Sequence, residues 1–130
     1  MPKVPTVTKI TVKRIIDGDP DLSYLQQNYE EKEFSETQRI EYKQKDKERL
    51  ESYGTFWFML GIKAEAEYLI PNGSYAIIQN LHSGGLWGVE SDSGKDYLES
   101  IENEQIDELK DYCRKMNIEI PSNVEIIREV

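Results

Sequence analysis

Three aspartates near the N-terminus have the spacing that most clearly suggests chemistry. Asp17, Asp19 and Asp21 occupy alternate positions, as do the first ligands of an EF-hand calcium loop. The rest of that pattern fails, because its sixth position is Leu22 where glycine is needed and its twelfth is Asn28 where a bidentate glutamate is needed. We therefore predict that these aspartates end a strand and form a turn, and we predict no metal site.

A second pair of carboxylates, Glu90 and Asp92, alternates at the expected end of another strand. Paired carboxylates can serve acid–base or metal chemistry. The neighbouring Ser91 and Ser93 make capping of the next helix the simpler role for this segment. Together with the three aspartates, the pair defines an alternative hypothesis, a small metal-dependent hydrolase.

Other catalytic patterns are absent from the sequence. His82 is the single histidine and stands beside Ser83 in an expected turn, so it lacks a second histidine for a zinc site, and no G-x-S-x-G motif is present. Cys113 is the single cysteine, which excludes a disulfide within the chain and predicts an inert buried thiol. We predict no catalytic residue and no cofactor.

Three glycines, Gly84, Gly85 and Gly88, surround Trp87. They fit neither a dinucleotide fingerprint nor a P-loop, because no Lys-Ser or Lys-Thr pair follows them. Their spacing predicts a close approach of backbone to a large ring. We expect Trp87 to be buried, as a core or cross-strand partner of Trp57.

The charge of the chain is strongly negative, at −9, and is concentrated in two segments. Residues 17–36 and 90–117 hold most of the acids, which argues against nucleic acid as a direct ligand and for either solubility or a basic protein partner. The longest uncharged apolar stretch, residues 55–62, is far shorter than the roughly 20 residues of a membrane span. We expect a cytoplasmic protein.

Alternating and β-branched residues predict strands over residues 4–16, 55–69, 74–81 and 86–90. Gly61 should mark a bulge in the second strand, and residues 71–73 should form a tight turn before the third. A polar helix should begin at Ser35 or Thr37 and end before Gly54.

Two further helices are expected near the C-terminus, over residues 94–103 and 103–116. Ser91, Asp92 and Ser93 should cap the first, and Asn117 should stop the second. The fold prediction is a single α+β domain over residues 1–130, with a small antiparallel sheet covered by these helices. Residues 17–36 are expected to form an acidic, partly ordered loop, and residues 118–130 a weakly ordered tail or edge strand.

A stretch running from Ser83 to Ser93, SGGLWGVESDS, resembles a family of uncharacterised small proteins carried by phages and other mobile elements. The resemblance extends to the following Tyr97-Leu98, to residues 104–109, and to the upstream segments 61–67 and 19–25. The sequence departs from the pattern at Gln26-Gln27, where a Gly-Glu pair is expected. The resemblance implies a genomic context and no activity.

The favoured function is a non-enzymatic interaction protein that presents acidic surface to a basic host protein. It could block a basic nucleic-acid-binding site, as anti-CRISPR and anti-restriction proteins do. An assembly or accessory factor of the mobile element is a further alternative. The expected contact surface is a set of outward carboxylates on the C-terminal helices: Glu99, Glu102, Glu104, Asp107, Glu108 and Asp111.

Overall fold

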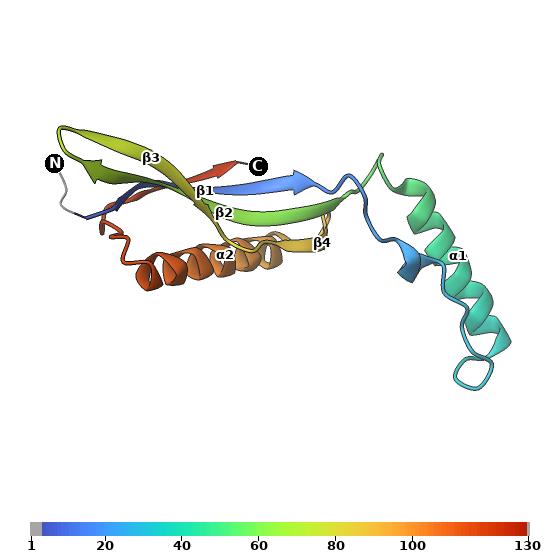
Figure 1. The fold of residues 1–130 in the computed structure, drawn as a ribbon. Helices are drawn as coiled ribbons and strands as arrows, with labels where there is room; N and C mark the ends of the chain where they lie inside the picture. The colour runs from blue at the N-terminus through green and yellow to red at the C-terminus, as the bar shows by residue number, and fades with distance from the viewer. Residues whose placement is uncertain (1–3, 130) are drawn as a thin grey trace.

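The computed structural model describes residues 4–129, which form a five-stranded sheet with a long helix on one face and a second helix beyond its end (Figure 1). The elements in chain order are β1 (Thr6–Ile16), the short 3₁₀ helix η1 (Ser23–Leu25), α1 (Glu36–Ser52), β2 (Met59–Asn72), β3 (Tyr75–His82), β4 (Leu86–Glu90), α2 (Lys95–Lys115) and β5 (Glu125–Glu129). The α+β class is confirmed.

The long strand β2 organises the sheet, whose order is β3-β2-β1-β5. It pairs antiparallel with β1 along one edge, and along the other edge it pairs antiparallel first with β4 and then with β3. The last strand, β5, runs parallel to β1, so the sheet is mixed and not wholly antiparallel. The parallel pairing follows from α2, which carries the chain back along the sheet before β5 begins.

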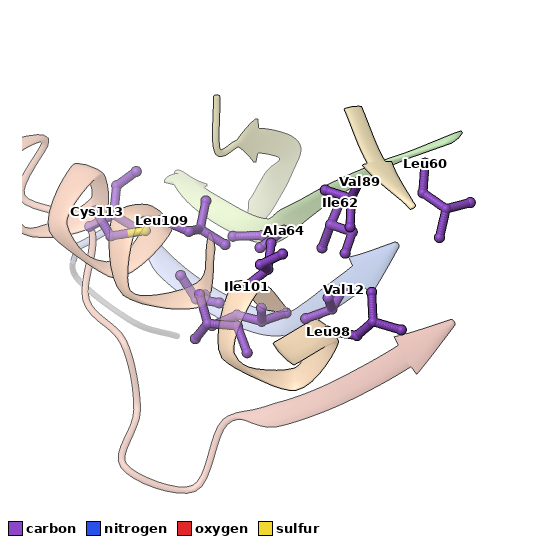
Figure 2. Packing of buried hydrophobic residues seen from close by; sticks show 14 residues of the cluster. Val12, Leu60, Ile62, Ala64, Val89, Leu98, Ile101, Leu109 and Cys113 are labelled. Carbon is purple, nitrogen blue, oxygen red and sulfur yellow. The ribbon is translucent and has the colours of Figure 1, made fainter. Parts of the chain in front are cut away.

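The hydrophobic core lies between α2 and one face of the sheet, hereafter the inner face (Figure 2). Alternate residues of β1 and β2 point to this face, as the period of a strand requires. The small side chains of Ala64 and Ala66 on β2 lie beneath α2, and both are fully buried. From the helix, Leu98, Ile101 and Leu109 fill the layer, and burial of each such side chain contributes roughly 1.5–3 kcal/mol.

The C-terminal helical segment is one helix, α2, and not the two that were predicted. Asn103, expected as a cap, is an exposed residue in its middle. The helix begins after Gly94 without any side-chain cap, so the capping role predicted for Ser91, Asp92 and Ser93 is wrong. Continuous packing of its apolar stripe on β2 outweighs the local preference of Asn103 for a cap. Asn117 ends the segment with a φ of 57°, as predicted.

Helix α1 lies beyond the end of the sheet, away from α2 (Figure 1). Ser35 begins it with a capping box to Gln38, and none of its residues is buried. A second, smaller cluster of buried side chains, Leu25, Trp57 and Met59, joins η1 and α1 to the start of β2.

The hairpin between β2 and β3 turns through Gly73 and Ser74, with Asn72 paired to Tyr75. Gly73 has a φ of 65° and Ser74 does not have a positive φ, which is the pattern of a type II′ turn with glycine at its first central position. The bulge predicted in β2 is wrong: Leu60 pairs with Val89 and Ile62 with Leu86, so the extra residue lies on β4, opposite Gly61.

Candidate functional site

The Ser-Gly-Gly turn, residues 83–85, is joined to α2 by hydrogen bonds. Ser83 is buried; its Oγ accepts a hydrogen bond from the Ala64 backbone N–H (2.9 Å) and donates one to Gln105 Oε1 (2.7 Å). The same oxygen of Gln105 also accepts from the Gly85 N–H at 3.0 Å. Ser83 and Gln105 are both buried, so these hydrogen bonds join the turn to the helix above the sheet.

Glu108, one turn further along α2, supports the same connection. One of its carboxylate oxygens accepts from the Gly84 N–H at 3.4 Å and from the hydroxyl of Tyr112. The hydrogen bond that the Tyr112 phenol donates to this carboxylate raises the pKa of the phenol, and the negative charge of Glu108 adds to the effect. Glu108 therefore has a structural role, which weakens its predicted role as an outward contact residue.

Trp87 is not buried, contrary to the prediction, since 51% of its surface is exposed. Its ring lies over Gly61, where an added Cβ would come within 2.3 Å of the ring. Gly61 points to the face opposite the core, because its neighbours Leu60 and Ile62 point inward. The ring therefore rests on the outer face of the sheet, and Gly61 is the residue that permits its close approach.

Trp57 is buried, but in the cluster near α1 and not beside Trp87. The guanidinium of Arg49 stacks over its ring at 3.7 Å, and the indole N–H donates to the Arg49 carbonyl at 2.9 Å. Arg49 also forms a bidentate ion pair with Asp92, with nitrogen–oxygen distances of 2.6 and 2.7 Å, and a second ion pair with Glu90. The pair lowers the pKa of Asp92 and raises that of Arg49.

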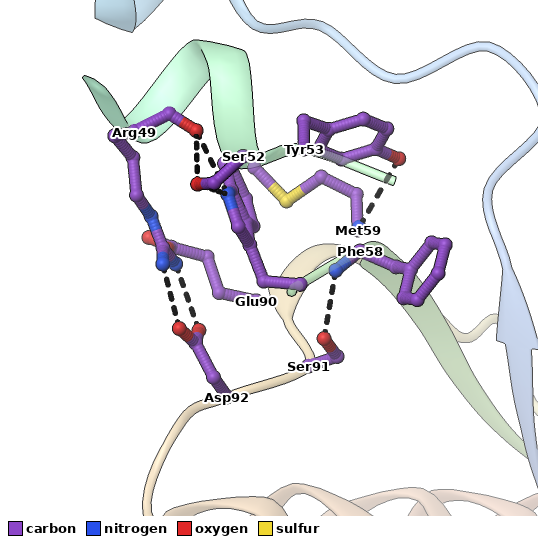
Figure 3. A network of polar contacts seen from close by, with 9 residues as sticks. Arg49, Ser52, Tyr53, Phe58, Met59, Glu90, Ser91 and Asp92 are labelled. Carbon is purple, nitrogen blue, oxygen red and sulfur yellow. Dashed lines mark hydrogen bonds and ion pairs between the residues drawn. The ribbon is translucent and has the colours of Figure 1, made fainter. Parts of the chain in front are cut away.

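Four of the five carboxylates of the hydrolase hypothesis, those of Asp17, Asp21, Glu90 and Asp92, are thus engaged in structure. Glu90 and Asp92 hold α1 against the connection from β4 to α2 (Figure 3). Asp17 accepts from the backbone N–H of Asp19, and Asp21 accepts from that of Ser23, so these residues form local turns. Within residues 4–129, no group of three or more histidine, cysteine, aspartate or glutamate side chains is placed to hold a metal ion.

The serines of the same motif likewise serve the chain connection. Ser91 Oγ accepts from the Phe58 N–H at 2.7 Å and its own N–H donates to the Phe58 carbonyl at 2.8 Å. These two bonds tie the end of β4 to the start of β2. Ser93 donates its backbone N–H to the carbonyl of Glu90, which closes a turn before α2.

Glu102 does not lie on the acidic outer surface, contrary to the prediction, because only 1% of it is exposed. It forms ion pairs with Arg14 of β1 at 3.2 Å and with Arg128 of β5 at 3.3 Å. Its second carboxylate oxygen is buried without a hydrogen-bond partner among the described residues. Glu102 therefore connects three elements, α2, β1 and β5, from beneath the helix.

Three of the predicted contact residues do face solvent on α2: Glu99, Glu104 and Asp107, here called the acidic ridge. Glu99 forms a weak ion pair with Lys95 at 3.9 Å, and the described residues offer Glu104 and Asp107 no ion pair. Asp111, by contrast, pairs with Lys115 at 2.8 Å, which lowers the pKa of this aspartate. The ridge is smaller than the predicted surface.

The surface of the described residues also has two hollows. A cavity of about 510 Å³ lies between the C-terminal part of α2 and residues 118–126, with Ile118, Ile120 and Val124 on its apolar side and Lys110 and Arg114 on its helix side. A smaller hollow of about 170 Å³ lies on the outer face of the sheet and is lined mostly by charged residues. Neither contains the carboxylates of the hydrolase hypothesis.

Comparison with known proteins gives no match, whether to family models, to curated proteins or to solved structures. No helix in residues 4–129 has the length and apolar character needed to cross a membrane. The interpretation of function therefore depends on the geometry described above.

Proposed function

We propose that this protein is a non-enzymatic interaction module of the cytoplasm whose acidic ridge, Glu99, Glu104 and Asp107, binds a basic protein. The single observation that supports this most is the availability of these carboxylates on a helix held rigidly in place. Solvated carboxylates with at most one weak surface ion pair among them cost little to bring against a cationic surface, and they steer its approach over long range.

Three sets of contacts on its inner side hold α2 in place. Its apolar stripe is buried against β2, Gln105 fixes it to the Ser-Gly-Gly turn, and Glu102 anchors it to two strands. A surface held in one conformation loses little conformational freedom on binding, so more of the interaction energy appears as affinity.

The spacing of the ridge favours a partner that otherwise binds nucleic acid. With a rise of about 1.5 Å per residue, its carboxylates follow one another at intervals of roughly 7.5 and 4.5 Å along the helix axis. Phosphates of one DNA strand are spaced about 3.4 Å along the duplex axis, which is of the same order. A basic groove that accepts phosphates could therefore accept the ridge, and binding there would occlude the groove in the manner proposed for anti-CRISPR or anti-restriction proteins.

A pulldown from the natural host, with the full chain as bait, tests the proposal. The variant Glu99→Gln/Glu104→Gln/Asp107→Asn removes the ridge, and Glu41→Gln/Glu48→Gln/Glu51→Gln makes the same charge change on exposed residues of α1. We expect one basic protein to be captured by the native chain and by the α1 variant, and to be lost with the ridge variant.

Association rates of the captured protein provide the second measurement. They should fall between about 50 and 200 mM salt for the native chain and depend less on salt for the ridge variant. Equal capture and equal salt dependence for both variants would refute the proposal. Capture of phage structural components in place of a basic host protein would favour the accessory-factor alternative.

A further inference from the structure

Among residues 4–129, the outer edge of β3 is the longest uncharged strand edge. The strand lies at the end of the sheet order, with β2 as its neighbour on one side and no other strand among the described residues on the other. From Tyr75 to Leu81 it contains no charged residue and no proline. Tyr75, Ile77 and Ile78 are exposed, Ile78 to 60%.

Natural sheets usually protect such an edge. Charged side chains, proline, bulges or very short strands prevent another chain from pairing with the exposed N–H and C=O groups. The edge strand β5 follows this rule, since Glu125, Arg128 and Glu129 are charged, and β4 is only five residues long. The eight residues of β3 show none of these devices, and its pairing with β2 has no register shift.

The type II′ hairpin determines which backbone groups face outward. Because Asn72 and Tyr75 close a two-residue loop, they form a hydrogen-bonded pair, and the alternate residues Ala76, Ile78 and Asn80 direct their N–H and C=O groups away from β2. The hairpin occupies the end of the sheet remote from α1, so α1 does not cover these groups (Figure 1).

We propose that β3 pairs antiparallel with β3 of a second copy of this chain, forming a two-fold symmetric dimer with one continuous sheet. We choose a second copy of this chain as the partner because two uncharged β3 edges can pair without bringing like charges together. The chain carries a charge of −9, and two copies repel each other over most of their surfaces. Residues 75–81 bring no charge to the contact, so pairing there avoids placing like charges on opposite strands.

Symmetry restricts the register of this pairing. A two-fold axis perpendicular to the sheet keeps each residue on the same face in both copies, so one residue must lie opposite its own equivalent. The middle of the uncharged segment 75–81 is Ile78, whose backbone groups point outward. Ile78 then pairs with Ile78 of the second copy, Ala76 with Asn80, and Tyr75 with Leu81, and the two α2 helices lie on the same face of the joint sheet.

Sedimentation velocity over a concentration series, with the full chain, measures this self-association. Ile78→Lys should raise the dimer dissociation constant tenfold or more, because two ammonium groups would meet at the axis and apolar burial would be lost. Ile16→Lys is the matched control, since Ile16 is 58% exposed on β1 and the substitution makes the same charge change. The control should dimerise like the native chain.

Salt distinguishes this contact from an ionic one. Screening reduces the repulsion between two chains of −9, so the native dimer should become tighter between about 50 and 200 mM salt. A native chain that stays monomeric, an unaffected dimer in Ile78→Lys, or a dimer that weakens with salt would each refute the proposal.

Hydrogen exchange on the native chain tests the same contact without a substitution. The N–H groups of Ala76, Ile78 and Asn80 should become protected as protein concentration rises, whereas those of Ile77 and Gln79, which bond to β2, should be protected throughout. Protection of Ile78 that does not change with concentration would contradict the dimer.

Discussion

Glu102 provides the sharpest test of how this fold is held together. The substitution Glu102→Gln keeps the volume of the side chain and removes its charge, which leaves Arg14 and Arg128 without their carboxylate. Breaking a fully buried ion pair from one side typically costs 3–5 kcal/mol. The two arginine side chains are 24% and 42% exposed and keep part of their hydration, so we expect a smaller loss, about 2 kcal/mol of unfolding free energy.

Urea unfolding monitored by circular dichroism gives this free energy, with Glu99→Gln as the control on the solvent side of the same helix. The control should change stability by less than about 0.5 kcal/mol. In a double-mutant cycle, Arg14→Leu should cost about 1–2 kcal/mol less in a Glu102→Leu background than in the native chain, because the partner is already gone. Equal effects of Glu102→Gln and Glu99→Gln, or full additivity in the cycle, would refute the role assigned to Glu102.

The remaining predictions concern the tryptophans and the ion pair beneath α1. Trp57→Ala should destabilise the protein by about 3–5 kcal/mol and Trp87→Ala by only about 1–2 kcal/mol, as measured by urea unfolding, because Trp57 is buried and Trp87 is half exposed. Gly61→Ala should cost about 1–3 kcal/mol in the native chain and clearly less in the Trp87→Ala background, since the added methyl group clashes with that ring. Arg49 lowers the pKa of Asp92 in the folded state, so their ion pair stabilises the fold above about pH 4. This contribution is lost as the pH falls further and Asp92 becomes protonated. In Arg49→Gln, stability should therefore depend less steeply on pH during acid unfolding below about pH 4.

The strands could be predicted because local signals and tertiary packing agree there. Ile62, Ala64 and Ala66 alternate with charged residues in the sequence, and all three are buried beneath α2. Asn117 likewise stops α2 in the left-handed conformation that its side chain tolerates. At such positions the residue type that favours the local backbone conformation is also the one that the tertiary structure requires.

The buried roles of Glu102 and Gln105 were not predicted, because glutamate and glutamine side chains are usually exposed to solvent. A signal was present nonetheless, since both lie on the apolar stripe of α2, between Leu98 and Leu109 at helical spacing. A polar residue on such a stripe must have a buried partner. That partner comes from distant segments: Arg14 is 88 residues away from Glu102 in sequence, and only the tertiary fold brings the two together.

The exposure of Trp87 could not be predicted from its type or its spacing. Val89, two residues later, faces the core, so regular alternation would place Trp87 there as well. Gly88 adopts a φ of 76° between them and breaks the alternation, because β4 has one extra residue between Leu86 and Val89 relative to the facing residues of β2. The ring consequently lies on the outer face, where Gly61 leaves room for it.

Salt separates the two surfaces proposed for this protein, because the forces at them have opposite signs. The acidic ridge attracts a partner of opposite charge, so added salt weakens its binding, whereas the uncharged edge of β3 joins two chains of like charge, so added salt strengthens it. The two surfaces are also linked through the dimer, because its two acidic ridges lie on the same side. A partner with two basic sites would bind both ridges at once, with higher avidity. Ile78→Lys should therefore reduce the affinity for a partner that carries two such sites while leaving binding to a single site unchanged, whereas the ridge variant should weaken both.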